Sequence, residues 1–439
     1  MLSATEAVAE MARGAISAED YTRACLDRIA ATEDEVRAFA HIDPEYAIAQ
    51  ARERDEWRQT GREIGPLHGV PVGIKDIIDT TDYPTECGTP LMAGRRPRRD
   101  ATVVGKLRAA GAVIIGKTVT TECAYFHPGK TRNPHDPTRT PGGSSSGSAA
   151  AVAAGMVPLA VGSQTNGSVI RPASYCGTFA IKPSHGLVSR AGVLTLSRSL
   201  DHVGPFARTL DDLALILDAM TGHDPSDPDT RPLAAPAFQS VLAQDPPAPP
   251  RYAFVRTPVW DRKITPDAAA AFAELIDAVG ERIDTVELPE HFAGAWEAQR
   301  QIMSVEMAHN LGAMVDRGGE ASSQKLRDLL AGGREVGAVD YLAAISLGRT
   351  LAGSLTAYFD LYDAIITPSA PGVAPGIETT GDPAFCTLWS LTGLPAVTLP
   401  LLKGENGLPI GVQLIGPHGD DARLLRTARA LLGTLADTE

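Results

Sequence analysis

The chain has 439 residues, of which 44% are hydrophobic, so it is long enough to bury a large core and is not intrinsically disordered. Its 40 basic and 53 acidic residues give a formal net charge of −13, which argues against a nucleic-acid partner and against an anionic membrane surface. Five scattered cysteines without a CxxC pair indicate reduced thiols in a cytoplasmic protein, with neither a disulfide framework nor a zinc site.

The N-terminus is acidic and lacks a long apolar segment, so no signal peptide is expected. No apolar run reaches about 18 residues, and we therefore expect no membrane span. A first helix is predicted to end at Gly14, and Ser17 has the position of an N-cap for a second helix that runs to about residue 33. Residues 45–61 are predicted to form a charged surface helix.

The following segment alternates short apolar strands with helices. LHGVPVGIKD is predicted to be a buried strand that ends in Lys75 and Asp76. A helix over 101–110 and the strand AVIIGKT come next. A loop rich in Pro, Asn and His then leads to Pro141–Pro172, where two Gly/Ser-rich loops lie at the ends of a short Ala-rich helix and a buried strand. Loops held by rigid elements are frequent sites of chemistry.

The composition changes at residues 222–250, which are rich in Pro and Asp and are interpreted as a connector. Beyond it, two strands are predicted around a helix at 266–281, and residues 299–358 are mostly helical. Further buried strands and a last helix at 421–434 close the chain. The alternation of strands and helices predicts an α/β fold with a largely parallel or mixed sheet.

One segment matches the phosphate-loop pattern GxxxxGK[ST], namely GAVIIGKT from Gly111 to Thr118. A phosphate loop follows a strand and opens a helix at its lysine. Here the four variable positions are apolar and would themselves be the strand, which cannot wrap a phosphate. A nucleotide-binding protein is therefore a remote alternative, and Lys117 is interpreted as an ordinary strand-end residue.

A second segment matches the GxSxG pattern of α/β-hydrolases, with Ser145 at its centre. That serine should follow a strand, whereas the preceding HDPTRTP is a turn-rich loop. The histidines form no HxH or HExxH spacing, which argues against a metal site, and none stands in a distinctive context for a Ser–His–Asp enzyme. Ser322 and Lys325 form an SxxK in a polar helix, which we interpret as a solvated face.

A serine nucleophile without a histidine needs another base, and lysine can serve if burial lowers its pKa from about 10.4 toward neutrality. Lys75 follows the apolar run GVPVGI, which would carry it inside the protein. An equally plausible interpretation from these residues alone is a buried lysine paired with Asp76 or Asp79.

Several segments together resemble the amidase signature family. They are, in order, GVPVGIKD, PGGSSSGSAAAVAAG, GSQTNGSVIRPASYCG and IKPSHG, followed near the C-terminus by GLPAVTLP and LPIGVQLIG. Lys75 precedes Ser144 by 69 residues and Ser144 precedes Ser168 by 24, and this spacing also agrees with the family. The resemblance spans roughly residues 60–210 and 360–435. It implies an α/β fold with a large mixed β-sheet covered by helices on both faces.

The resemblance also implies a Ser–cisSer–Lys triad. Ser168 would be the nucleophile, and Ser144, preceded by a cis peptide, would connect it to the base Lys75. The oxyanion hole would be formed by the backbone N–H groups of four consecutive residues: Thr165, Asn166, Gly167 and Ser168. No cofactor and no metal are implied.

Residues around this triad are expected to support it. Ser145 would orient Lys75 as a hydrogen-bond donor. Arg171 stands third after the nucleophile, as in bacterial members that resemble malonamidase, and would brace the loop through backbone carbonyls or, as the alternative, bind a substrate carboxylate. Gln164 and Asn166 stand where many family members have Asp and Gly, differences that bear on the substrate and not on the triad.

Substrate contacts are expected from three parts of the chain. Tyr125 and Phe126 form an aromatic pair interpreted as a wall of the substrate cleft. Gly142 and Gly143 would lie beside the reacting group, and Trp389 would provide an apolar surface. The low charge of the motif region favours a small neutral or aryl acyl group.

The resemblance thus implies a hydrolase of linear carboxylic amides that acts through an acyl-enzyme, with esters and carbamates (urethanes) as further substrates. We expect a cytoplasmic monomer or homodimer that acts on a small-molecule amide. The alternative is the amidase subunit of a tRNA-dependent amidotransferase, which requires partner subunits.

The whole chain, 1–439, is interpreted as one amidase signature domain. Its expected parts are N-terminal helices (1–61), a catalytic core (62–210), the connector (222–250), a variable region that shapes the substrate cleft (251–358) and a C-terminal segment that completes the core (359–439).

Overall fold

The structure, a computed structural model, describes residues 1–404 and 406–436. Its centre is a mixed sheet of eleven strands in the order β1-β3-β2-β4-β6-β5-β10-β11-β9-β7-β8. The strands are β1 (Phe39–Ile42), β2 (Pro71–Lys75), β3 (Val113–Thr118), β4 (Leu159–Gln164), β5 (Phe179–Lys182), β6 (His202–Ala207), β7 (Tyr252–Arg256), β8 (Ile283–Glu287), β9 (Ala364–Pro368), β10 (Ala396–Lys403) and β11 (Pro409–Ile415).

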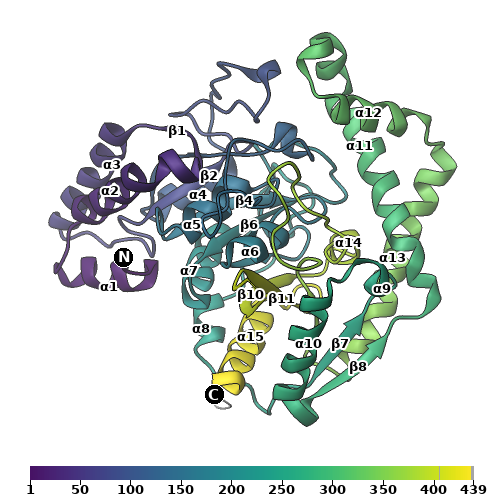
Figure 1. The fold of residues 1–439 in the computed structure, drawn as a ribbon. Coiled ribbons are helices and arrows are strands. Elements are labelled where there is room, and N and C mark those ends of the chain that lie inside the picture. The colour runs from purple at the N-terminus through teal and green to yellow at the C-terminus, as the bar shows by residue number, and fades with distance from the viewer. Residues whose placement is uncertain (405, 437–439) are drawn as a thin grey trace.

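Helices cover both faces of this sheet (Figure 1), as the sequence predicts. The α-helices are α1 (Ala4–Arg13), α2 (Ala18–Val36), α3 (Pro44–Gln59), α4 (Thr102–Ala109), α5 (Ser146–Ala153), α6 (Ile170–Cys176), α7 (Leu210–Met220), α8 (Phe238–Leu242), α9 (Trp260–Lys263), α10 (Pro266–Val279), α11 (Ala295–Gly318), α12 (Gln324–Glu335), α13 (Ala338–Phe359), α14 (Thr387–Leu391) and α15 (Asp421–Ala436). Short 3-10 helices are η1 (Pro90–Met92), η2 (Glu122–Ala124), η3 (Gly280–Arg282), η4 (Glu290–Gly294) and η5 (Gly319–Ala321).

Local sequence explains where the first helices begin and end. Ser3 and Ser17 each accept a hydrogen bond from the backbone of the third helical residue, and each helix has an acidic side chain that completes a capping box. Gly14 ends α1 in the left-handed conformation at φ 74°. The predicted connector at 222–250 is irregular except for the short helix α8.

The sheet combines parallel and antiparallel pairs. β2 pairs in parallel with both β3 and β4, and β4 pairs antiparallel with β6. Sequence analysis does not predict β1 or β6. The sequence of β6, HVGPFA, contains both Gly and Pro, which weaken its strand pattern. Every residue of β2 and β4 is buried, so their last residues, Lys75 and Gln164, end inside the protein.

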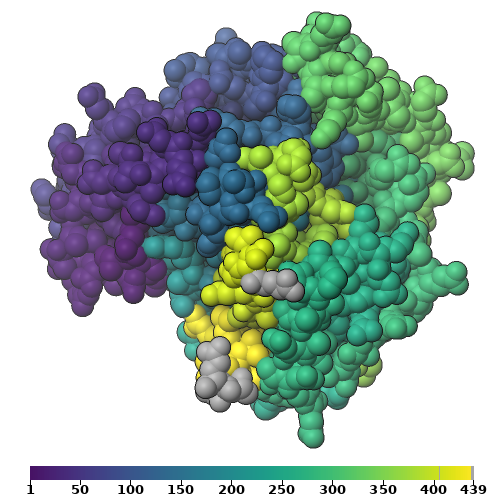
Figure 2. All heavy atoms as spheres, in the orientation of Figure 1, coloured from purple at the N-terminus to yellow at the C-terminus, as the bar shows by residue number. Residues whose placement is uncertain are grey.

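The first helices of the chain and two long helices from its second half lie on different sides of the molecule. In Figure 1 the helices α1–α3 lie at the left and the long helices α11 and α13 at the right. Figure 2 shows the C-terminal segment, in yellow, between these flanks. No helix within 1–404 and 406–436 is both long enough and apolar enough to cross a membrane.

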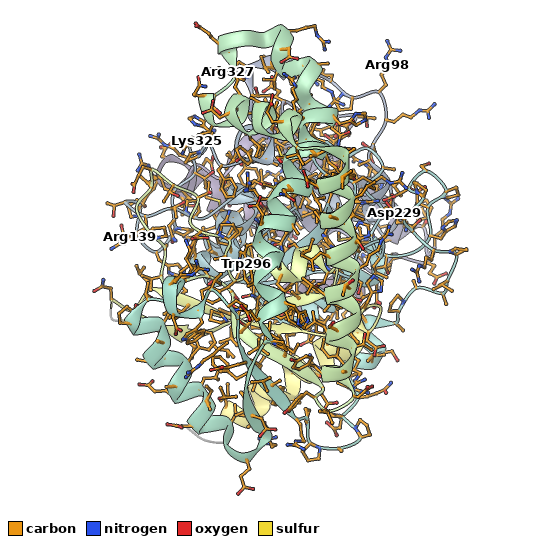
Figure 3. The ribbon with its side chains drawn as sticks, turned by 90° about the vertical axis from the view of Figure 1, so that its right-hand side faces the viewer. Arg98, Arg139, Asp229, Trp296, Lys325 and Arg327 are labelled. Carbon is orange, nitrogen blue, oxygen red and sulfur yellow. The ribbon has the colours of Figure 1, made fainter. Side chains whose placement is uncertain are left out.

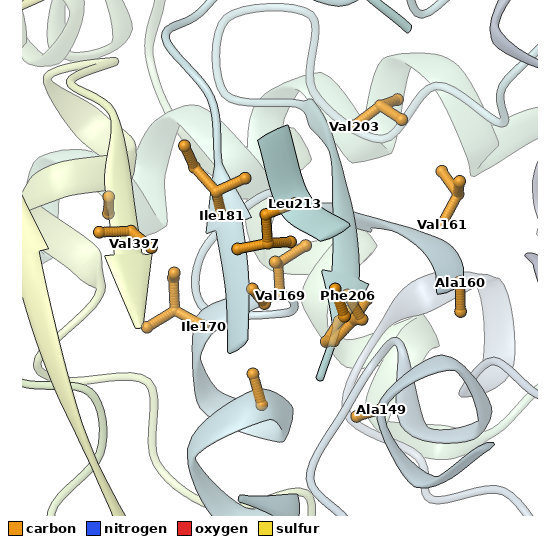
Figure 4. Packing of buried hydrophobic residues seen from close by; sticks show 14 of the residues in the cluster. Ala149, Ala160, Val161, Val169, Ile170, Ile181, Val203, Phe206, Leu213 and Val397 are labelled. Carbon is orange, nitrogen blue, oxygen red and sulfur yellow. The ribbon is translucent and has the colours of Figure 1, made fainter. Parts of the chain in front are cut away.

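The core extends to the loops of Pro141–Pro172. Figure 4 shows Val169 and Ile170 packed among side chains of the sheet and of α7, including Ile181, Leu213 and Val397. Ser168 therefore immediately precedes residues that are fully buried. Packing on this side anchors the loop that carries it.

Candidate active site

Lys75 lies at the end of β2 and is fully buried. Its Nζ is 2.7 Å from Ser144 Oγ and 2.8 Å from Ser163 Oγ. The two carboxylates considered as partners are engaged elsewhere: Asp76 lies 3.6 Å from the Lys117 ammonium, and Asp79 binds Arg95 at 2.6 Å. Lys75 thus contacts hydroxyl groups and no carboxylate of the described residues.

Burial lowers the pKa of Lys75 well below its ordinary value, because a charged ammonium loses its hydration there. The charge of Asp201 opposes this effect. Burial also raises the pKa of Asp201 to about 6, against hydrogen bonds that favour its charged form. The environment of Lys75 therefore favours the neutral amine, which can accept a proton.

Ser144 follows a cis peptide bond between Gly143 and Ser144, just before α5. The Gly143 carbonyl accepts a hydrogen bond of 2.6 Å from Arg171 Nη2. Ser144 is buried, with its hydroxyl toward Lys75. A cis bond at this position is what the family resemblance implies.

Ser168 shares a small cavity with Ser144. Thr165, Arg171, Phe126 and further residues complete the lining of this inner cavity. Its volume of about 10 Å³ is the space of a single water molecule. Ser144 and Ser168 thus line the same cavity, and Lys75, which does not line it, forms a hydrogen bond with Ser144.

The loop 165–168 is closed by the side chain of Gln164. Its Oε1 accepts hydrogen bonds from the backbone N–H groups of Val169 (2.8 Å) and Ile170 (3.0 Å), and its Nε2 donates to Ser390 Oγ at 3.0 Å. Gln164 therefore ties the residue before the loop to the first residues after it.

Within this loop, the backbone N–H groups of residues 165–168 donate to no acceptor of the described chain. Gly167 leaves no room for a side chain, since a Cβ there would lie 2.9 Å from Pro383 Cβ. Four adjacent unpaired donors beside a hydroxyl can stabilise a developing negative charge.

Side chains from distant elements hold the same loop. Asn166 Nδ2 donates to Gln299 Oε1 at 3.1 Å, and Thr387 Oγ1 donates to Asn166 Oδ1 at 2.9 Å. Thr165 Oγ1 donates to Asp201 Oδ1 at 2.6 Å. Asn166 therefore links the loop to α11 and α14.

Arg171 is 1% exposed and lines the inner cavity. Besides its bond to Gly143, its guanidinium lies 5.5 Å from the centre of the Phe126 ring. Its Nε and Nη1 have no hydrogen-bond partner among the described residues. Burial lowers its pKa. The hydrogen bond to the Gly143 carbonyl is what a role in bracing the loop requires. The two unpaired nitrogens also leave Arg171 able to bind a substrate carboxylate.

Ser145 and Trp389 lie elsewhere than expected. Ser145 does not reach Lys75: its Oγ donates to the Ser163 carbonyl at 3.1 Å and accepts from the Ser163 N–H at 3.2 Å. The hydroxyl beside Lys75 belongs to Ser163. Trp389 is fully buried in α14 and lines neither cavity near Ser168, because its apolar ring packs into the core.

The glycines before Ser144 do not line the inner cavity either. Gly142, at φ 83°, packs so closely on Pro172 that a Cβ would lie 2.7 Å from its Cα. Gly143 is enclosed by Thr380 and Thr121, and only its carbonyl takes part, through Arg171. Both glycines let neighbouring segments pack closely against the backbone. The sequence had suggested that they contact the substrate instead.

The inner cavity opens into a larger one of about 780 Å³, which we call the outer cavity. The two share Tyr125, Phe126, Asn166 and Met303. The rings of Tyr125 and Phe126 meet edge to face with centroids 4.9 Å apart. Helix α11 supplies much of the opposite wall, including Trp296.

The structure also shows that the phosphate-loop pattern at Gly111–Thr118 is not a phosphate-binding loop. Residues 113–118 form β3, and Lys117 is buried with its Nζ 2.7 Å from the Ile78 carbonyl and 2.5 Å from Thr85 Oγ1. No phosphate could reach it. Within 1–404 and 406–436, no group of three or more His, Cys, Asp or Glu side chains could hold a metal ion.

Comparisons with known proteins agree with this geometry. Residues 20–425 match the amidase family. The chain is 38% identical to the A subunit of glutamyl-tRNA(Gln) amidotransferase from Chloroflexus aurantiacus, over 98% of this chain and 96% of that protein.

Solved structures are similar along the whole chain. A chain from a vestigial protein complex connected with the evolutionary origins of an s-triazine catabolic enzyme has a TM-score of 0.92 and 33% identity, over 99% of this chain and 98% of the other. Peptide amidase from Stenotrophomonas maltophilia has a TM-score of 0.86 and 31% identity, over 99% and 97%. The chain belongs to the amidase signature family and is a hydrolase of that class.

Proposed function

We propose that the chain hydrolyses linear carboxylic amides of small molecules through an acyl-enzyme on Ser168. The observation that carries this proposal is the buried Lys75 amine, which lacks a carboxylate partner in the described chain and lies 2.7 Å from Ser144 Oγ, beside the cavity that holds Ser168. A buried, unpaired lysine is costly to a fold, and such groups cluster at functional sites.

In the proposed reaction, the neutral Lys75 amine takes the proton of Ser144, which takes the proton of Ser168. Ser168 Oγ attacks the amide carbon, and the negative oxygen is held by the backbone N–H groups of residues 165–168. The proton then returns through Ser144 to the leaving nitrogen, and the C–N bond breaks. Water attacks the acyl-enzyme by the same route, giving the carboxylic acid and free Ser168.

Esters and carbamates are proposed as additional substrates, because they pass through a similar tetrahedral intermediate. The five cysteines, all unpaired, fit a reducing, cytoplasmic environment. The malonamidase-like position of Arg171 supports two roles, bracing of the Gly143 carbonyl and contact with the substrate.

A second candidate is the amidase subunit of a tRNA-dependent amidotransferase, favoured by the 38% identity to a protein of that kind. That role requires partner subunits and delivery of ammonia to them. Co-purification from the native host followed by an ammonia-transfer assay separates it from a stand-alone hydrolase, which releases free ammonia.

The direct test is a fluorophosphonate label mapped by mass spectrometry, which we expect on Ser168 and not on Ser145. Ser168→Ala, Ser144→Ala and Lys75→Ala should each lose at least about 100-fold in kcat/KM on an amide screen while remaining folded. Ser145→Ala is the matched control. Wild-type turnover by Ser168→Ala would refute the mechanism.

A further inference from the structure

The outer cavity is one of two larger cavities beside the inner one; the other, of about 650 Å³, shares Thr165 and Leu196 with it. The inner cavity holds about 10 Å³ and the outer one about 780 Å³, within the usual range for small-molecule sites. The inner cavity has room for about one water molecule, so little of a substrate can lie beside Ser168. Of the two larger cavities, the outer cavity shares the aromatic pair Tyr125 and Phe126 with the inner one, which gives the rest of a substrate an apolar path.

This outer cavity has one more basic side chain than acidic side chains in its lining. Its lining contains three basic side chains, Lys263, Arg300 and Lys325, and two acidic ones, Asp328 and Asp382. The chain as a whole has a net charge of −13.

Two of these cations are already paired. Lys263 contacts Asp382 at 2.7 Å, and Arg300 contacts Glu297 at 2.6 Å. Lys325 has no ion pair with any residue in the described part of the chain. Asp328, its acidic neighbour in α12, accepts a hydrogen bond of 2.6 Å from Gln324. Lys325 is therefore the cation that is free to bind a ligand.

The position of Lys325 is tied to the reaction site. Ser323 caps the N-terminus of α12, and its own backbone N–H donates to the Glu122 carboxylate at 3.0 Å. Glu122 belongs to η2, three residues before Tyr125. Figure 3 shows Lys325 above Trp296 along the helical wall. The lysine that sequence analysis placed on a solvated face thus stands at the mouth of the substrate cavity.

We propose that the outer cavity binds a carboxylate carried by the substrate at the end remote from the scissile amide, with Lys325 as its main contact. This inference rests on the proposed amide hydrolysis. The aromatic side chains between Ser168 and Lys325 would accommodate a neutral, apolar spacer. A neutral acyl group at the reacting end is compatible with an anionic group at the far end.

The test uses diacid monoamides of increasing chain length, each compared with the neutral monoamide of the same length, with ammonia release as the readout. Wild-type enzyme should prefer the carboxylate-bearing member at one or more lengths. Lys325→Gln should lower that preference in kcat/KM about fivefold, mainly through KM, as removal of a charge contact at an exposed site predicts. Added salt should weaken the wild-type preference in the same direction.

Two further variants sharpen the result. Lys325→Glu should favour substrates with a terminal ammonium group over those with a carboxylate. Lys403→Gln removes an exposed lysine that does not line the outer cavity, and it should leave the preference unchanged. An equal preference in wild type and Lys325→Gln at every length would overturn the inference while neutral amides are still hydrolysed.

Failure of the proposed function gives a different result. If wild type hydrolyses no amide of either series, the hydrolytic proposal fails. Calorimetric measurement of the affinity of wild type and Lys325→Gln for the same diacid monoamides then tests the carboxylate site independently of hydrolysis. Equal affinities of the two proteins would overturn it, and at least fivefold weaker binding by Lys325→Gln would support it.

Discussion

Replacing Gln164 by methionine tests whether one buried amide keeps the loop 165–168 in its closed shape. The substitution retains the approximate length and volume of the side chain but removes three hydrogen bonds. Two of these come from the N–H groups of Val169 and Ile170, and the third goes to Ser390. Val169 and Ile170 are fully buried, so water cannot replace the lost acceptor.

The expected loss of unfolding free energy follows from these contacts. A net contribution of about 1 kcal/mol for each of the three hydrogen bonds predicts a loss of about 3 kcal/mol in the free energy of unfolding. The loss should not be smaller, because the N–H groups of Val169 and Ile170 stay buried without an acceptor. The loop also carries the unpaired N–H groups beside Ser168. Because loss of one oxyanion donor reduces kcat about 100-fold or more, a displaced loop should reduce kcat at least about tenfold, with a smaller change in KM.

Urea denaturation followed by tryptophan fluorescence, together with steady-state amide hydrolysis, measures both quantities. Gln164→Glu is the matched control, since its carboxyl group keeps an acceptor for both N–H groups and should lose less stability and less kcat. An unchanged urea midpoint and an unchanged kcat in Gln164→Met would refute the assignment of Gln164 as the residue that closes the loop.

Two more predictions concern the buried cations. Because burial lowers the pKa of Lys75, the unfolded chain binds more protons than the folded one between the lowered pKa and about 10.4. Wild-type stability should therefore rise with pH across that window. Lys75→Met should be inactive yet more stable than wild type at pH 7, with the advantage shrinking toward pH 10, as urea midpoints at both values will show; a less stable variant at pH 7 would contradict this. Arg171→Met removes the donor to the Gly143 carbonyl and should lower kcat about tenfold or more on neutral amides; a rise in KM confined to carboxylate-bearing amides would instead identify Arg171 as a substrate contact.

The segments that carry the triad could be predicted because their signals are local. An apolar run before Lys75 determines that the lysine is buried, and Gly/Ser-rich turns before and after the Ala-rich helix mark the loops of Ser144 and Ser168. Helix ends at Ser17 and Gly14 follow from capping, which involves only neighbouring residues.

The partners of those residues were not predictable, because they come from distant parts of the chain. Ser163 faces Lys75 only once β2 and β4 are paired, and Asp201 reaches Thr165 only because β6 runs antiparallel to β4. An alternating pattern along β4 places Ser163 on one face, but nothing in the sequence names its partner. Gln299 likewise meets Asn166 only through the packing of α11.

Trp389 shows the same limit of the sequence, whereas the position of Lys325 agrees with the sequence. Apolar character suggested a substrate contact for Trp389, yet α14 packs its ring into the core and presents Ser390 and Thr387 to the loop. Lys325 is exposed, as the polar character of its segment suggests, and the contact of Glu122 with Ser323 brings its helix to the rim of the outer cavity. Residue chemistry, local order and the family resemblance thus indicated the proposed reacting groups of this protein. Only tertiary packing, which joins strands and helices far apart in the chain, decided what surrounds them.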